Sequence, residues 1–184
     1  KSNPMAEGTV HPEQALLAAS SWYLMSFFFA CILLESFQLR ALVSVSLLLT
    51  FLYTPLLKGV LFLKNLVVAF VIAQAIVLGG LAVGDVRMQS TLLPSLYMFC
   101  LILWQEVLMD IRDVRGDAEA GIRTIPVVLG CKFAALLALL SAGLAALLPL
   151  LASGSTVARL ALPLVQLPLL HSTWRLVVAE KVKA

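Results

Sequence analysis

Apolar residues run along this chain in six long stretches, which short polar or charged segments separate. None of the stretches alternates apolar and polar residues with a period of two, so a transmembrane β-barrel is not expected. About 20 apolar residues in a helix cross the hydrocarbon core of a bilayer. The pattern therefore predicts an all-α, polytopic transmembrane bundle with six spans, which run approximately over Ala15–Leu34, Ala41–Leu57, Leu66–Val83, Leu92–Leu108, Phe133–Ala152 and Leu160–Val178.

Composition supports the same class of protein. Hydrophobic residues make up 61% of the chain and charged residues 12%, whereas soluble domains contain about 45–50% and about 25%. No internal repeat or linker divides the sequence, so residues 1–184 are interpreted as a single transmembrane domain. The expected partner is the lipid bilayer, and binding to nucleic acid is not expected. Cys31, Cys100 and Cys131 lie in apolar contexts without metal-ligand spacing, and we interpret them as small packing residues.

The positive charges predict an orientation. Lys and Arg total 13, and only Arg40, Arg87 and Arg159 fall on one side of the predicted spans. The remaining ten fall on the other side, together with both chain ends. Because cytoplasmic loops carry an excess of Lys and Arg, both ends are expected on the cytoplasmic side, or on its stromal or matrix equivalent.

One charged segment stands out from the apolar background. It runs from Gln105 to Gly130 and reads QEVLMDIRDVRGDAEAGIRTIPVVLG. Asp110, Asp113 and Asp117 follow one another at offsets of 0, 3 and 7, with Glu106 one turn earlier, so a helix would place all four carboxylates on one face. Oxygen ligands with a high local charge suit Mg²⁺, which bridges carboxylates to substrate phosphates.

The place of this cluster favours an enzyme. Ionisable residues retained in a membrane protein indicate a functional site by default. A transporter more often places its key charges near the middle of the bilayer, whereas these aspartates lie at the end of a predicted span, on the side of the positive charges. There the cluster would meet soluble diphosphates and Mg²⁺.

The motifs resemble those of the UbiA superfamily of membrane prenyltransferases. Asp110-x-x-Asp113-x-x-Gly116-Asp117, followed by Gly121-Ile-Arg123-Thr-Ile-Pro126 and Leu129-Gly130, resembles the second aspartate-rich motif of that family. The segment Tyr53-Thr-Pro-Leu-Leu-Lys58, with Lys64-Asn65 after it, resembles the family's tyrosine–lysine element. The opening KSNPMAEGTVHPEQAL resembles the segment that follows the family's first aspartate-rich motif. The resemblance is collinear from Lys1 to Gly130.

The resemblance implies a Mg²⁺-dependent transfer of a polyprenyl group. The donor would be a polyprenyl diphosphate, and the acceptor would be a lipophilic molecule of the aromatic or glycerol-phosphate type. Asp110, Asp113 and Asp117 would bind the metal, which would compensate the charge that builds on the leaving diphosphate. Cationic side chains would contact the diphosphate oxygens, and Tyr53 would donate a hydrogen bond to them; the cations implied are Lys58, Arg123, Arg112 and Arg115.

The sequence also departs from the family pattern. The first aspartate-rich motif is missing, Asn3 replaces the usual Arg before Pro4, and Tyr53 and Lys58 are five residues apart instead of four. No span follows Val178. We therefore expect a C-terminal fragment that begins between the second and third helices of a nine-helix bundle, stops after the eighth, and has little or no activity by itself.

Other interpretations remain open at this stage. Arg112 and Arg115 could extend to lipid headgroups, Lys58 and Lys64 could serve only as topology determinants, and Asn65 could cap a helix. For the chain as a whole, the alternatives are a non-enzymatic transporter and an assembly subunit. The longer motif of the CDP-alcohol phosphotransferases is not matched.

Overall fold

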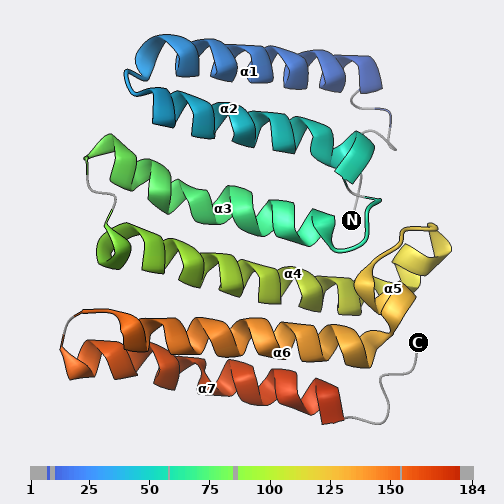
Figure 1. Ribbon diagram of the computed structural model, residues 1–184. Coiled ribbons are helices and arrows are strands. Elements are labelled where there is room, and N and C mark those ends of the chain that lie inside the picture. Colours follow the sequence, from blue (N-terminus) through green and yellow to red (C-terminus); the bar gives the residue numbers. More distant parts are fainter. Residues whose placement is uncertain (1–7, 9–10, 58, 85–86, 154, 179–184) are drawn as a thin grey trace. The chain divides into compact units, whose positions relative to one another are not determined.

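The computed structural model describes residues 8, 11–57, 59–84, 87–153 and 155–178. Within these residues every regular element is a helix, which agrees with the predicted all-α class (Figure 1). The elements are α1 (Pro12–Leu33), α2 (Phe37–Leu52), η1 (Tyr53–Leu57), α3 (Leu63–Ala82), η2 (Met88–Leu92), α4 (Leu93–Glu119), α5 (Ile125–Leu129), α6 (Cys131–Leu147), η3 (Leu148–Leu151) and α7 (Thr156–Val178). The segments η1 and η2 are π-helical, and η3 is a 3₁₀ turn.

Four helices in the described residues are long and apolar enough to cross a membrane, and they make the chain an integral membrane protein. They are Pro12–Leu33, Leu63–Ala82, Ser90–Glu119 and Cys131–Leu151. The prediction of six spans is therefore confirmed only in part. Helix α2 has 16 residues, which is short for a crossing, and α7 contains two prolines and polar side chains such as Gln166 that reduce its hydropathy.

The chain divides into two compact units, Lys1–Leu48 and Leu49–Ala184. In the first unit, Ala30 is the one buried residue of α1, and α2 has none. Large apolar side chains such as Leu17, Trp22 and Phe28 are exposed along α1. Helices with so much apolar surface need lipid or other helices around them.

In the second unit, α3, α4, α6 and α7 lie side by side in chain order, and each contacts the next (Figure 1). The short helix α5 packs against α4 and α6. The core contains Val107 and Ile125 together with Ala134 and Ala138 of α6. Small residues at a membrane helix interface let two backbones approach closely, and the buried face of α6 is built almost entirely of alanine.

Polar side chains join neighbouring helices within this row. Ser95 of α4 donates a hydrogen bond of 2.9 Å to the carbonyl oxygen of Ala73 in α3. Ser141 of α6 donates one of 2.8 Å to the carbonyl oxygen of Cys100 in α4. Hydrogen bonds of this kind hold helices together where lipid removes the hydrophobic driving force.

Helices α4 and α7 are linked by two side-chain pairs that are seven residues apart on each helix. The Nε2 amide of Gln166 donates to the hydroxyl of Tyr97 (2.5 Å), and the indole Nε1 of Trp104 donates to the hydroxyl of Thr173 (3.0 Å). Seven residues are close to two helical turns, so both pairs lie on the same face of each helix.

Candidate functional site

The aspartate motif lies at the end of α4, which continues to Glu119 instead of ending near Leu108 as the hydropathy pattern predicts. No proline interrupts Asp110–Glu119, so the helix continues past the apolar part of the segment. The structure therefore places Asp110, Asp113 and Asp117 on one helix. After α4 the chain turns at Gly121, whose φ of +70° suits the left-handed conformation common after helix ends.

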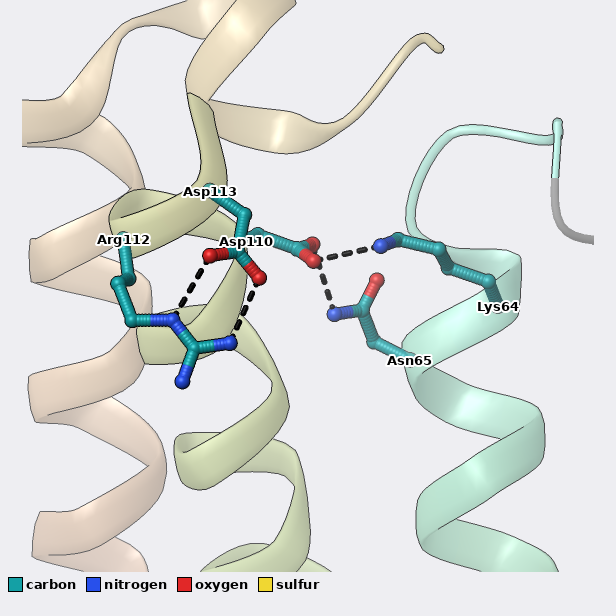
Figure 2. A network of polar contacts seen from close by, with 5 residues as sticks. All are labelled: Lys64, Asn65, Asp110, Arg112 and Asp113. Atoms are coloured by element: carbon teal, nitrogen blue, oxygen red, sulfur yellow. Dashed lines mark hydrogen bonds and ion pairs between the residues drawn. The ribbon is translucent and has the colours of Figure 1, made fainter. Parts of the chain in front are cut away.

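Asp110 is buried between α4 and α3, with 4% of its surface exposed. Lys64 donates from Nζ to Oδ1 of Asp110 at 2.5 Å, and Asn65 donates from Nδ2 to Oδ2 at 3.0 Å. Figure 2 shows both side chains reaching from the first turn of α3 toward the same carboxylate. Both oxygens of Asp110 are thus held by the neighbouring helix.

The start of α3 positions these two partners. Phe62 precedes the helix with a φ of +64°, the one positive value among the described residues other than glycine. Its carbonyl oxygen accepts hydrogen bonds from the backbone N–H groups of Asn65 (3.1 Å) and Leu66 (3.2 Å). Phe62 also packs against the core, and this packing holds a conformation that costs about 1–2 kcal/mol for a residue with a Cβ.

The other polar atom of the Asn65 side chain is unsatisfied. Asn65 is fully buried, and its Oδ1 has no hydrogen-bond partner within the described structure. In Figure 2 this oxygen lies on the side of the Asn65 amide that faces the Lys64 ammonium. A buried acceptor without a partner is uncommon and indicates a strained or functional position.

Asp113 has a different environment. Arg112 donates two parallel hydrogen bonds of 2.7 Å to the Asp113 carboxylate, from Nε and from Nη2 (Figure 2). This pair is exposed, with 67% of the Arg112 side chain and 50% of the Asp113 side chain accessible. Asp117 is half-buried, and its backbone carbonyl accepts a hydrogen bond of 2.8 Å from the N–H of Ile122.

The three aspartates share a helix, but their carboxylates do not converge. In the part of the chain that the structure describes, no three Asp, Glu, His or Cys side chains are grouped so that they could hold a metal ion. Asp110 is turned toward α3, and Asp113 is turned toward Arg112. A metal role for Asp110, Asp113 and Asp117 therefore stays a prediction.

Tyr53 lies in η1, where the charges of Lys64, Glu106 and Asp110 act on its phenol. Burial raises the pKa of its phenol above the usual value; the positive charge of Lys64 lowers that pKa in part, and the negative charges of Glu106 and Asp110 raise it further. At neutral pH Tyr53 is therefore a protonated phenol, which can donate a hydrogen bond. Tyr53 is thus within electrostatic range of Lys64, Glu106 and Asp110, and its hydrogen bond to a diphosphate stays a prediction.

The predicted diphosphate-binding cations have different surroundings. Arg112 pairs with Asp113, Arg115 is exposed on the last part of α4, and Arg123 is exposed in the segment between α4 and α5. Lys58 lies outside the described residues. Their roles at a diphosphate stay predictions.

Two residues of the site were not assigned to it from the sequence. A role as a topology determinant is one interpretation of Lys64 in the sequence; in the structure its ammonium pairs with Asp110. The interpretation of Asn65 as a helix cap is wrong, because Phe62 occupies the cap position and Asn65 lies inside the first turn. The sequence signal was present, since Lys64-Asn65 directly follows the tyrosine–lysine element.

Comparison with known proteins identifies relatives of the chain. It is 30% identical over 139 residues to the digeranylgeranylglyceryl phosphate synthase of Pyrococcus furiosus, covering 74% of this chain and 48% of that protein. The enzyme of the same name from Thermococcus kodakarensis is 31% identical, covering 72% and 46%, and that from Hyperthermus butylicus is 33% identical, covering 71% and 45%. The chain thus spans about half the length of these curated relatives. No solved structure matches it significantly.

The family assignment rests on a longer match. The pattern that describes the UbiA prenyltransferase family matches residues 1–184, which include the helices and the aspartate motif described above. The resemblance noted from the motifs is thereby confirmed, and the chain belongs to the UbiA prenyltransferase family.

Proposed function

We propose that this chain is part of a membrane prenyltransferase that moves a polyprenyl group from its diphosphate to a glycerol-phosphate-type acceptor. The observation that carries the proposal is the family match over the whole chain, together with relatives that are named digeranylgeranylglyceryl phosphate synthase. The name of these relatives favours a glycerol-phosphate acceptor over the aromatic acceptors that other family members use.

In this reaction the allylic C–O bond of the donor breaks, and its electron pair leaves with the diphosphate. An oxygen of the acceptor forms the new bond to carbon and loses its proton. Negative charge therefore builds on the diphosphate, and fixed positive charges that face it lower the barrier.

The chemistry of the donors fits Mg²⁺, which prefers carboxylate and amide oxygens. Asp110, Asp113 and Asp117 on α4 would hold the ion, and the unpaired Oδ1 of the buried Asn65 is a further oxygen donor beside Asp110. When bound there, the ion supplies a Lewis acid for the diphosphate oxygens. Residues 1–184 contain only one of the family's two aspartate-rich motifs. We therefore expect these residues alone to catalyse prenyl transfer slowly or not at all.

Protein side chains contribute the remaining contacts in this proposal. Arg123, Arg115 and Lys58 bind diphosphate oxygens, as does Arg112 once it leaves Asp113. The neutral phenol of Tyr53 donates a hydrogen bond to the same group. Apolar side chains of the helix row surround the prenyl tail and exclude water from the developing carbocation.

We also propose the side of the membrane on which the site lies. The excess of Lys and Arg near the chain ends, in residues 58–64 and in residues 112–132 favours the cytoplasmic side, or its stromal or matrix equivalent. Soluble diphosphate is released there without crossing the bilayer.

The proposal is tested with membranes that contain the complete reading frame encoding these residues. A radiolabelled polyprenyl diphosphate is offered with either a prenylated glycerol phosphate or an aromatic acid as acceptor. Label should enter a lipid extract with the first acceptor and require Mg²⁺. Label transferred only to the aromatic acid would overturn the acceptor class.

The same assay separates the enzyme from the two alternatives. A variant with alanine at Asp113 and Asp117 should insert into the membrane and lose transfer. A transporter or an assembly subunit would show no prenyl transfer in the unsubstituted protein, and an assembly subunit would keep its role after both substitutions.

A further inference from the structure

The ammonium group of Lys64 pairs with Asp110, a buried carboxylate whose second oxygen accepts a hydrogen bond from Asn65. It contacts Oδ1 of Asp110 at 2.5 Å, and the unpaired Oδ1 of Asn65 faces it (Figure 2). A carboxylate and an amide oxygen are also the donors that a divalent cation would use. We propose that Lys64 is a resident cation that competes with the divalent metal ion for Asp110.

Burial makes this competition strong. Asp110 is 4% exposed and the Lys64 side chain 13%, so water screens the pair only weakly. A divalent ion that bound Asp110 while Lys64 remained in place would meet a like charge at close range. Lys64 therefore has to move away before Asp110 can bind a metal ion fully.

The side chains around Asp110 allow such an exchange. Lysine has a flexible stem and a compact charge that can reach water, and Lys64 is near the start of α3, where its side chain is already partly accessible. The Oδ1 of Asn65, which has no hydrogen-bond partner within the described structure, would then serve the incoming ion beside Asp110.

The pair between Arg112 and Asp113 does not act in the same way. Both side chains are exposed, and the pair lies between adjacent residues on one helix. Water and salt weaken such a pair, so Asp113 is accessible to a metal ion without a buried rearrangement. Lys64 is thus the group that determines how tightly the metal is held at Asp110.

This inference rests on the metal role of Asp110 in the proposed function, and its tests do not measure activity. The first test uses the unsubstituted chain in detergent. A short pulse of acetic anhydride acetylates accessible lysines, and mass spectrometry compares Lys64 with Lys132, an exposed lysine on α6. Mg²⁺ should raise the ratio of Lys64 to Lys132 labelling several-fold relative to K⁺ at the same ionic strength.

The second test measures Mn²⁺ binding by electron paramagnetic resonance. Lys64→Met should tighten binding about ten-fold, because the competing cation is gone, whereas Lys132→Met should leave it unchanged. Asp110→Asn added to Lys64→Met should abolish the gain. If Lys64→Met does not fold, the labelling experiment decides alone.

The outcomes separate this inference from the function on which it rests. If Mn²⁺ binds but neither the labelling ratio nor the affinity changes, the Lys64 pair is purely structural and the inference is wrong, while the proposed function stands. If no Mn²⁺ binds to the unsubstituted chain or to Lys64→Met, the metal role of Asp110 fails, and the inference fails with it.

Discussion

Asp110→Asn is expected to destabilise the chain strongly, whereas Asp113→Asn, the same substitution three residues later on the same helix, is not. Asp110 is buried and paired with Lys64 and Asn65 of another helix. Asp113 is exposed and paired with its own neighbour. The two variants therefore remove the same charge from opposite environments.

The magnitude follows from the partners of Asp110. Removing one member of a buried ion pair costs about 3–5 kcal/mol, because the other charge is left without compensation. The asparagine oxygen can still accept one hydrogen bond, worth about 1 kcal/mol, and Lys64 can turn its charge partly toward water. We expect Asp110→Asn to lower the free energy of unfolding by about 2–4 kcal/mol, and Asp113→Asn to leave it unchanged within error.

The measurement is denaturant-induced unfolding in a mild detergent, followed by circular dichroism without divalent cations. Asp110→Asn combined with Lys64→Met should recover at least about 1 kcal/mol, because the unpaired ammonium is removed as well. Equal destabilisation by Asp110→Asn and Asp113→Asn, or no loss from Asp110→Asn, would refute the description of a buried Lys64–Asp110 pair.

Three further predictions concern the fold. Gly121→Ala should lower the free energy of unfolding by about 1–2 kcal/mol because its φ is +70°. Gly116→Ala inside α4 should raise it by about 0.5–1 kcal/mol, because the added Cβ would meet open space. Thermal unfolding of both variants measures these changes, and a change of the same sign in both would contradict the end of α4 before Gly121. Trp104→Phe and Thr173→Val should show a coupling of about 0.6 kcal/mol in a double-mutant cycle, and additive effects would mean that no hydrogen bond links them. Ala138→Leu should destabilise by about 1–3 kcal/mol, since Ala138 is fully buried in the core, and a stable variant would argue against close packing of α6.

Hydropathy predicted the helices well because a membrane helix satisfies all its backbone hydrogen bonds within its own segment. Each predicted stretch overlaps one of the long helices α1, α2, α3, α4, α6 and α7. The ends were less predictable. Helix α4 continues 11 residues beyond Leu108, since a polar segment without proline can stay helical in water as well as in lipid.

The site was predictable only along one helix. Periodicity places Asp110, Asp113 and Asp117 on a common face, but it cannot tell which carboxylate turns inward. Lys64 and Asn65 are 46 and 45 residues from Asp110 in the sequence, and their approach depends on how α3 packs against α4. Phe62, whose positive φ sets the start of α3, carries no local sign of that conformation either.

The central claim is that the aspartates of α4 serve prenyl transfer. The most direct measurement compares the unsubstituted protein with Asp113→Asn in membranes that express the complete reading frame, using a labelled polyprenyl diphosphate and a glycerol-phosphate-type acceptor. Because Asp113→Asn is expected to leave the fold intact, a loss of transfer reports on chemistry alone. We predict a fall in rate of at least about 100-fold at equal amounts of folded protein. A rate equal to that of the unsubstituted protein would contradict the account.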